Sequence, residues 1–126
     1  MYSTSISMEF RARHFLPNAT LPLERKMHTH SYVMEVTVTG RELDKNGYLL
    51  DLDKMETIMK RIVSSLSGHV LNGLPDIVGR TPSIEVLANI IWSRFVKWVD
   101  TPRIQSATVR VWEGENASAS FSGDVR

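Results

Sequence analysis

Two stretches of alternating apolar and polar residues predict the first two strands of the fold, at residues 3–14 and 30–43. The first stretch places apolar side chains on the same face as His14, namely Ile6, Met8, Phe10 and Ala12. The second continues the parity of His28 and His30 through Tyr32, Met34, Val36 and Val38. Because successive side chains of a strand point to opposite faces, all three histidines are expected on the face that becomes the core.

Two later stretches have helical periodicity. Asp51 is the expected N-cap of the first helix, which ends near Ser67 with Gly68 as its C-cap. Its apolar stripe is Met55, Ile58, Met59, Ile62, Val63 and Leu66. The second helix is expected to begin at Thr81, as N-cap, and Pro82, as first helical residue, and to end before Pro102. Its stripe is Ile84, Leu87, Ala88, Ile91, Phe95 and Trp98.

The remaining pattern predicts a short extended return at 48–50 and two final strands at 108–113 and 117–121, joined by a turn at 114–116. Residues 15–27 form a long loop that leads into the histidine pair, and such loops often serve active sites. The order strand, strand, helix, helix, strand, strand favours an α+β fold: a four-stranded antiparallel sheet with two helices on one face. The open sheet edges favour self-association.

Composition restricts the classes of function. The 126 residues are 42% hydrophobic and 23% charged, which predicts one globular domain over 1–126. The net charge of +1, without a basic stripe, argues against a nucleic-acid partner. The chain has no cysteine, hence no disulfide and no thiolate ligand. No apolar stretch is long enough to span a membrane and residues 1–4 lack a signal-peptide pattern, so we expect a cytoplasmic protein without a membrane partner.

The three histidines form the strongest chemical candidate. His14, His28 and His30 at the ends of neighbouring strands would give a three-histidine metal site with one open position, the arrangement of catalytic zinc. The residues by themselves leave a second interpretation open, in which each histidine is an ordinary half-buried side chain. Glu24, four residues before His28, is by the same reasoning a solvated loop carboxylate.

Five stretches carry a resemblance to a known family. They are residues 10–16 (FRARHFL), 28–32 (HTHSY), 46–51 (NGYLLD), 81–88 (TPSIEVLA) and 111–113 (VWE). Together they resemble the 6-pyruvoyl-tetrahydropterin synthase / 6-carboxy-tetrahydropterin synthase family over nearly the whole chain. The resemblance implies a T-fold, with sheets joined into trimeric barrels that stack as a hexamer, and active sites between subunits. It also implies that His14, His28 and His30 hold zinc.

The same resemblance assigns roles in substrate binding. Glu113 matches the carboxylate that anchors the pterin by accepting hydrogen bonds from its 2-amino group and ring N–H. Thr81, Ser83 and Glu85 lie where the family builds part of the pterin pocket, although capping explains Thr81 equally well.

The chain differs from the family's pattern at three places. Glu24 stands where the best-known members have a catalytic cysteine that acts as general base. Ser67-Gly68 stands where the family has an Asp-His pair, and His69 follows one residue later as the candidate proton donor. Thr29 replaces the usual glycine between the two histidines.

The expected function is a zinc-dependent lyase that acts on the side chain of 7,8-dihydroneopterin triphosphate or a related pterin. The branch with glutamate in place of cysteine is associated with release of 6-hydroxymethyl-dihydropterin; the other expected products are 6-pyruvoyl- and 6-carboxy-tetrahydropterin. Two alternatives remain open. One is a pterin- or purine-binding protein with little lyase activity, and the other is a structural metal site, or none.

Overall fold

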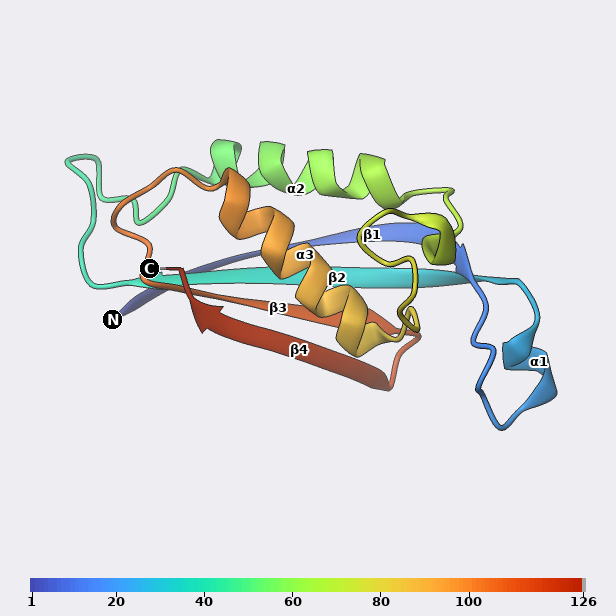
Figure 1. Ribbon diagram of the computed structural model, residues 1–126. Helices are drawn as coiled ribbons and strands as arrows, with labels where there is room; N and C mark the ends of the chain where they lie inside the picture. Colours follow the sequence, from blue (N-terminus) through green and yellow to red (C-terminus); the bar gives the residue numbers. More distant parts are fainter. Residues whose placement is uncertain (126) are drawn as a thin grey trace.

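A four-stranded antiparallel sheet in the order β1-β2-β3-β4 forms one layer of the computed structural model, which describes residues 1–125. The strands are β1 (Tyr2–His14), β2 (His28–Gly40), β3 (Ser106–Glu113) and β4 (Ala117–Asp124). Helices α2 (Leu52–Leu66) and α3 (Ile84–Trp98) cover one face of the sheet (Figure 1). The expected architecture is thereby confirmed. Two short elements add to it: α1 (Pro22–Arg25) and the 3₁₀ turn η1 (Leu71–Gly73).

The pairing of β1 with β2 determines which face the histidines occupy. Both strands are 13 residues long, and they pair from Tyr2 opposite Gly40 to His14 opposite His28. The expected parity is confirmed. In β1 the buried residues are Phe10, Ala12 and His14, and in β2 every second residue from Tyr32 onward is buried, on the same face as His28 and His30. The register therefore brings the three histidines to one end of the sheet.

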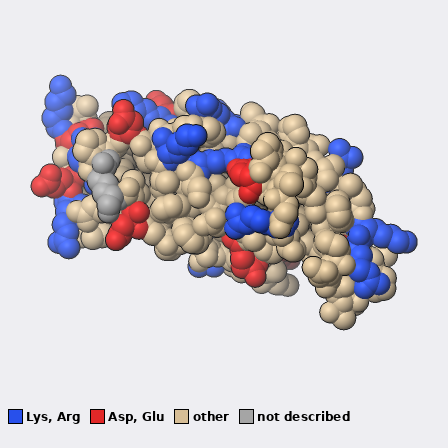
Figure 2. Space-filling model, viewed as in Figure 1, with Lys and Arg blue, Asp and Glu red and all other residues tan. Residues whose placement is uncertain are grey.

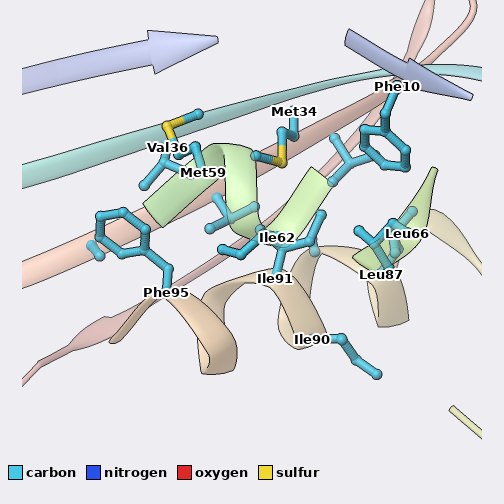
Figure 3. Close-up of a cluster of buried hydrophobic side chains, with 14 of the residues drawn as sticks. Phe10, Met34, Val36, Met59, Ile62, Leu66, Leu87, Ile90, Ile91 and Phe95 are labelled. Atoms are coloured by element: carbon cyan, nitrogen blue, oxygen red, sulfur yellow. The ribbon is translucent and has the colours of Figure 1, made fainter. Parts of the chain in front are cut away.

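The core lies between the sheet and the two helices. In Figure 3, side chains from β1, β2, α2 and α3 meet in one cluster; the labelled residues are Phe10, Met34, Val36, Met59, Ile62, Leu66, Leu87, Ile90, Ile91 and Phe95. All ten are at most 4% exposed, so both predicted helical stripes are confirmed at their centres. Ile58, Val63, Ile84 and Trp98, at the margins of the stripes, are only partly buried.

The start of α3 differs from the prediction. Ser83, not Thr81, is the N-cap: its backbone is extended and its side chain accepts a hydrogen bond from Val86 N. The first helical hydrogen bond runs from Leu87 N to the carbonyl oxygen of Ser83 at 2.9 Å, so the helix begins after Ser83 and Thr81 stays in the loop. Pro82 therefore lies before the helix, and its carbonyl group takes no part in the helical hydrogen bonds. At α2 the predicted cap is confirmed, since Asp51 accepts from Asp53 N.

Other boundaries also shift. The second strand runs over 28–40 instead of 30–43, and no strand forms at 48–50. That predicted return is a bend, because the Asp44 carboxylate accepts from Asn46 N and Tyr48 N and coils the chain locally. Leu49 and Leu50 are buried all the same. The last two strands are longer than predicted.

On the face shown in Figure 2, most of the surface is uncharged; basic and acidic side chains lie together at the left end and near the middle, and only basic ones are seen at the end that carries α1. Of the helices within residues 1–125, none combines the length and apolarity needed to cross a lipid bilayer. The loop that carries α1 projects beyond the end of the sheet (Figure 1). Its exposed side chains include Leu21, Leu23 and Met27.

Gly40 provides a test of the packing at the end of the sheet opposite the histidines. A Cβ atom there would lie 2.4 Å from the carbonyl oxygen of Arg103 and 2.7 Å from Leu49 Cδ1. We expect Gly40→Ala to lower the free energy of unfolding by about 1–3 kcal/mol, since backbone must move to accommodate the methyl group. Urea unfolding followed by circular dichroism measures this difference.

Gly73→Ala is the matched control, because a Cβ at Gly73 meets no atom within 4 Å. Its free energy of unfolding should stay within about 0.5 kcal/mol of the wild-type value. Equal stabilities of the two variants would contradict the close packing of Gly40 against Arg103.

Candidate metal centre

The three histidines converge as predicted. His14 is the last residue of β1, and His28 and His30 lie at the start of β2. Their ring centroids are 4.5 to 4.8 Å apart, and one nitrogen from each ring lies within 4.8 Å of the others. The Nε2 atoms of His14 and His28 are 2.9 Å apart. His14 is buried and the other two are half-buried, so the cluster lies at the surface end of the core.

Backbone carbonyl groups determine the orientation of two of the rings. His14 Nδ1 lies 3.2 Å from the carbonyl oxygen of Pro82, and His28 Nδ1 lies 2.6 Å from that of Lys26. A carbonyl oxygen only accepts, so each Nδ1 carries the proton and donates it. In the neutral rings Nε2 is then the atom with the free lone pair. Fixing one ring nitrogen in this way is what commonly prepares the other to bind a metal.

Electrostatics keep His14 neutral. Its burial, and then the neighbouring His30 and His28, lower its pKa from 6.5 to about 4, against a smaller opposing effect of the hydrogen bond to Pro82. A neutral imidazole is the form that ligates metals. The Nε2 atoms of His14 and His28 would also face each other with two lone pairs at 2.9 Å, a repulsive contact that a shared cation relieves. The residues present therefore fit a metal ion.

Glu113 lies at the edge of the cluster. Its Oε1 is 3.0 Å from His30 Nε2, and both side chains are between one quarter and one third exposed. The antiparallel register explains the meeting, since Glu113 ends β3 opposite Tyr32 of β2. The Tyr32 hydroxyl lies 3.2 Å from His14 Nδ1, and burial followed by the charge of Glu113 raises the pKa of Tyr32. Glu113 is thus part of the histidine cluster. The spacing of the residues along the chain did not predict this contact.

Several residues that fix the cluster were missed by sequence analysis. The carbonyl groups of Lys26 and Pro82 act through the backbone, which every residue possesses, so no sequence pattern marks them. Asn72 holds the residue after His14 by two hydrogen bonds to Phe15. The feature of the sequence that could have indicated Asn72 is an asparagine followed by glycine in the irregular segment after the first predicted helix.

The two predicted catalytic side chains, of Glu24 and His69, are exposed to solvent. Glu24 is exposed in α1, although its backbone oxygen accepts from Leu16 N at 2.8 Å and closes the loop near His14. His69 is also exposed, with its carbonyl oxygen accepting from Arg13 N at 3.0 Å. Within residues 1–125 neither side chain forms a hydrogen bond or ion pair with one of the three histidines.

The predicted pocket residues Thr81 and Ser83 flank Pro82, whose carbonyl oxygen lies beside His14 Nδ1. Thr81 is exposed, and Ser83 is half-buried with its hydroxyl engaged by Val86 N. Their segment therefore adjoins the cluster, with Ser83 in a capping role.

Comparison with known proteins agrees with this arrangement. The profile of the 6-pyruvoyl tetrahydropterin synthase family matches residues 3–124. A 6-carboxy-5,6,7,8-tetrahydropterin synthase from Bacillus subtilis is 27% identical over an alignment of 117 residues, and the match covers 89% of this chain and 77% of the relative.

Solved structures share the fold at low sequence identity. The 6-pyruvoyl tetrahydropterin synthase of Caenorhabditis elegans matches with a TM-score of 0.79 at 18% identity, covering 97% of this chain and 95% of that one. A catalytic-residue variant of the Plasmodium vivax enzyme, with glutamate replaced by alanine, matches with a TM-score of 0.77 at 15% identity and covers 98% and 99%. The fold is thus the T-fold, and the chain belongs to the 6-pyruvoyl tetrahydropterin synthase family, whose enzymes are lyases acting on pterins.

Proposed function

We propose that this chain is a zinc-dependent lyase that acts on the side chain of 7,8-dihydroneopterin triphosphate or a closely related pterin. The observation that carries the proposal is the cluster of His14, His28 and His30 with Glu113 at its edge, in a chain of this family. The Bacillus subtilis relative is named for a pterin product, which supports a pterin as the substrate class.

The three histidines would hold the zinc ion. Three neutral imidazoles are a common ligand set of catalytic zinc, and they leave a fourth position for substrate. A zinc ion held there would lower the pKa of substrate hydroxyl groups and polarise a neighbouring carbonyl group. The hydrogen bonds of His14 to Pro82 and of His28 to Lys26 keep the two rings aimed at that position.

Glu113 would anchor the pterin ring. A carboxylate can accept two parallel hydrogen bonds, and a pterin offers two in its 2-amino group and the adjacent ring N–H. Glu113 is half-buried and lies 3.0 Å from His30, so a pterin bound to it would lie next to the histidines. Thr81 and Ser83 would border the same pocket from the segment that precedes α3.

Glu24 would act as general base and remove a proton from a side-chain hydroxyl group of the substrate. Two observations support this role. The residue replaced in the Plasmodium vivax variant is a glutamate described as catalytic in that enzyme, and the hydrogen bond from Leu16 N fixes Glu24 near the end of β1. With glutamate as base, we propose 6-hydroxymethyl-dihydropterin as the product, ahead of a 6-pyruvoyl- or 6-carboxy-tetrahydropterin.

The exposure of Glu24 and His69 supports an active site completed by a second copy of the chain. We propose a homo-oligomer, a hexamer of two trimers, in which His69 of one copy returns the proton at the site of another. The outer strands of the sheet, β1 and β4, each have an edge available for pairing with a neighbour. The exposed Leu21, Leu23 and Met27 offer apolar surface next to the site for the same contact.

Metal analysis tests the zinc site. Protein purified without a histidine tag should carry about one zinc per chain, and His28→Ala should retain less than about a tenth of that amount, because two imidazoles bind zinc weakly. His69→Ala is the control and should keep its zinc. A wild-type protein that binds no zinc under saturating conditions would exclude the proposed metal site.

Replacing Glu24 tests the general base. Glu24→Gln should lower kcat with 7,8-dihydroneopterin triphosphate by about 10²- to 10⁴-fold, since the amide cannot accept the proton, while zinc content stays unchanged. Products are identified by mass spectrometry. The control is Glu42→Gln, which changes an exposed carboxylate after the other end of β2. Wild-type turnover by Glu24→Gln would remove this residue from the mechanism.

Replacing Glu113 tests the pterin anchor. Glu113→Gln should weaken pterin binding by about 10- to 100-fold, because charge-assisted hydrogen bonds are lost. Quenching of pterin fluorescence measures the dissociation constant, with zinc content determined on the same samples. Glu115→Gln, two residues further in the exposed turn, should bind like the wild type. Equal affinities of all three proteins would place the pterin elsewhere.

A further inference from the structure

The segment 69–83, between α2 and α3, is fastened to the end of β1 at successive points. The carbonyl oxygen of His69 accepts from Arg13 N at 3.0 Å, and the Asn72 side chain is hydrogen-bonded to the backbone of Phe15. The carbonyl oxygen of Pro82 lies 3.2 Å from His14 Nδ1. A parallel bridge between Arg13 and Val70 belongs to the same contact. In Figure 1 this yellow-green segment lies against the C-terminal end of β1. One segment therefore contacts the residues before and after His14 as well as its ring.

The contact of Asn72 is the most specific of these. Its amide nitrogen donates to the carbonyl oxygen of Phe15, and its amide oxygen accepts from Phe15 N, both at 3.0 Å. The strand pairing with β2 ends at His14, so Phe15 has no partner in that ladder. The Asn72 side chain supplies both backbone hydrogen bonds that a neighbouring strand would supply.

Asn72 can act as a fixed point because its own position is anchored. It is half-buried in η1, between the fully buried Leu71 and the turn bond from Gly73 N to Val70 O at 3.1 Å. The next residue, Leu16, is hydrogen-bonded to Glu24 and Ala19, which both belong to the long loop itself. Without Asn72, the backbone on the loop side of His14 would therefore lose its last pair of hydrogen bonds before that loop.

We infer that Asn72 is a positioning residue of the metal centre: it fixes the backbone beyond His14 and so holds this imidazole in register with His28 and His30. The inference rests on the proposed zinc site. Metal affinity depends on such supporting contacts because a ligand that moves freely must be ordered when the metal binds. A purely structural role, closing the 69–83 segment onto β1, would affect stability but leave the affinity for zinc unchanged.

The experiment measures the zinc dissociation constant of the full chain by competition with a chromophoric chelator. Asn72→Ala should bind zinc about 10- to 100-fold more weakly than the wild type. The visible absorption spectrum of the Co²⁺-substituted variant should also change, because it reports the geometry of the ligands independently of turnover. If Asn72→Ala does not fold, Asn72→Ser is measured by the same two criteria, since its shorter hydroxyl cannot reach both groups of Phe15.

Two controls separate positioning from stability. Gly40→Ala is destabilised at the opposite end of β2 and should keep the wild-type zinc affinity. Asn89→Ala removes another half-buried asparagine side chain, on α3, and should also bind normally. The inference is overturned if the Asn72 variant binds zinc like the wild type, or if Gly40→Ala loses as much affinity. Absence of zinc binding by the wild type would instead refute the proposed metal site itself, and this inference with it.

Discussion

The site depends above all on the continuous pairing of β1 with β2. Thirteen residues of each strand face each other without a bulge, and the last pair is His14 with His28. A shift of this register by one residue would turn a whole strand over and separate His14 from the other two histidines. The buried side chains of Phe10, Tyr32 and Met34 resist such a shift, because it would expose them to water. The hydrophobic core and the histidine cluster are thus specified by the same periodicity.

Hydrogen bonding and burial then give the histidines their chemical character. Burial lowers the pKa of His14 to about 4, so that the ring is neutral at physiological pH. The carbonyl groups of Lys26 and Pro82 determine which nitrogen of two rings carries the proton. Neither contact comes from a side chain, and both carbonyls belong to irregular segments beside the strands. The loops at this end of the sheet therefore orient the imidazole rings of His14 and His28.

Glu24 and His69 are exposed, and in the described part of the chain neither side chain has a hydrogen bond or ion pair to the three histidines. The sheet with its two helices presents the three histidines at one end, where two of the three are only half-buried. Exposed carboxylate and imidazole groups near an open strand edge are available to a neighbouring subunit. The proposed sharing of the active site between copies would make association a condition for catalysis, with exposed apolar residues such as Leu23 available for the contact.

The sequence by itself determined the order of the main elements, the face of each strand and the convergence of the three histidines, because side-chain periodicity is a local property of the backbone. It was less accurate at Ser83, which caps α3 in place of Thr81 two residues earlier, and at 48–50, where hydrogen bonds to Asp44 replace a strand by a bend. Only the tertiary structure decided the contacts between segments far apart in sequence. Asn72 on Phe15, Pro82 on His14 and Glu113 on His30 join residues whose proximity arises from packing, and no local pattern encodes which of them meet.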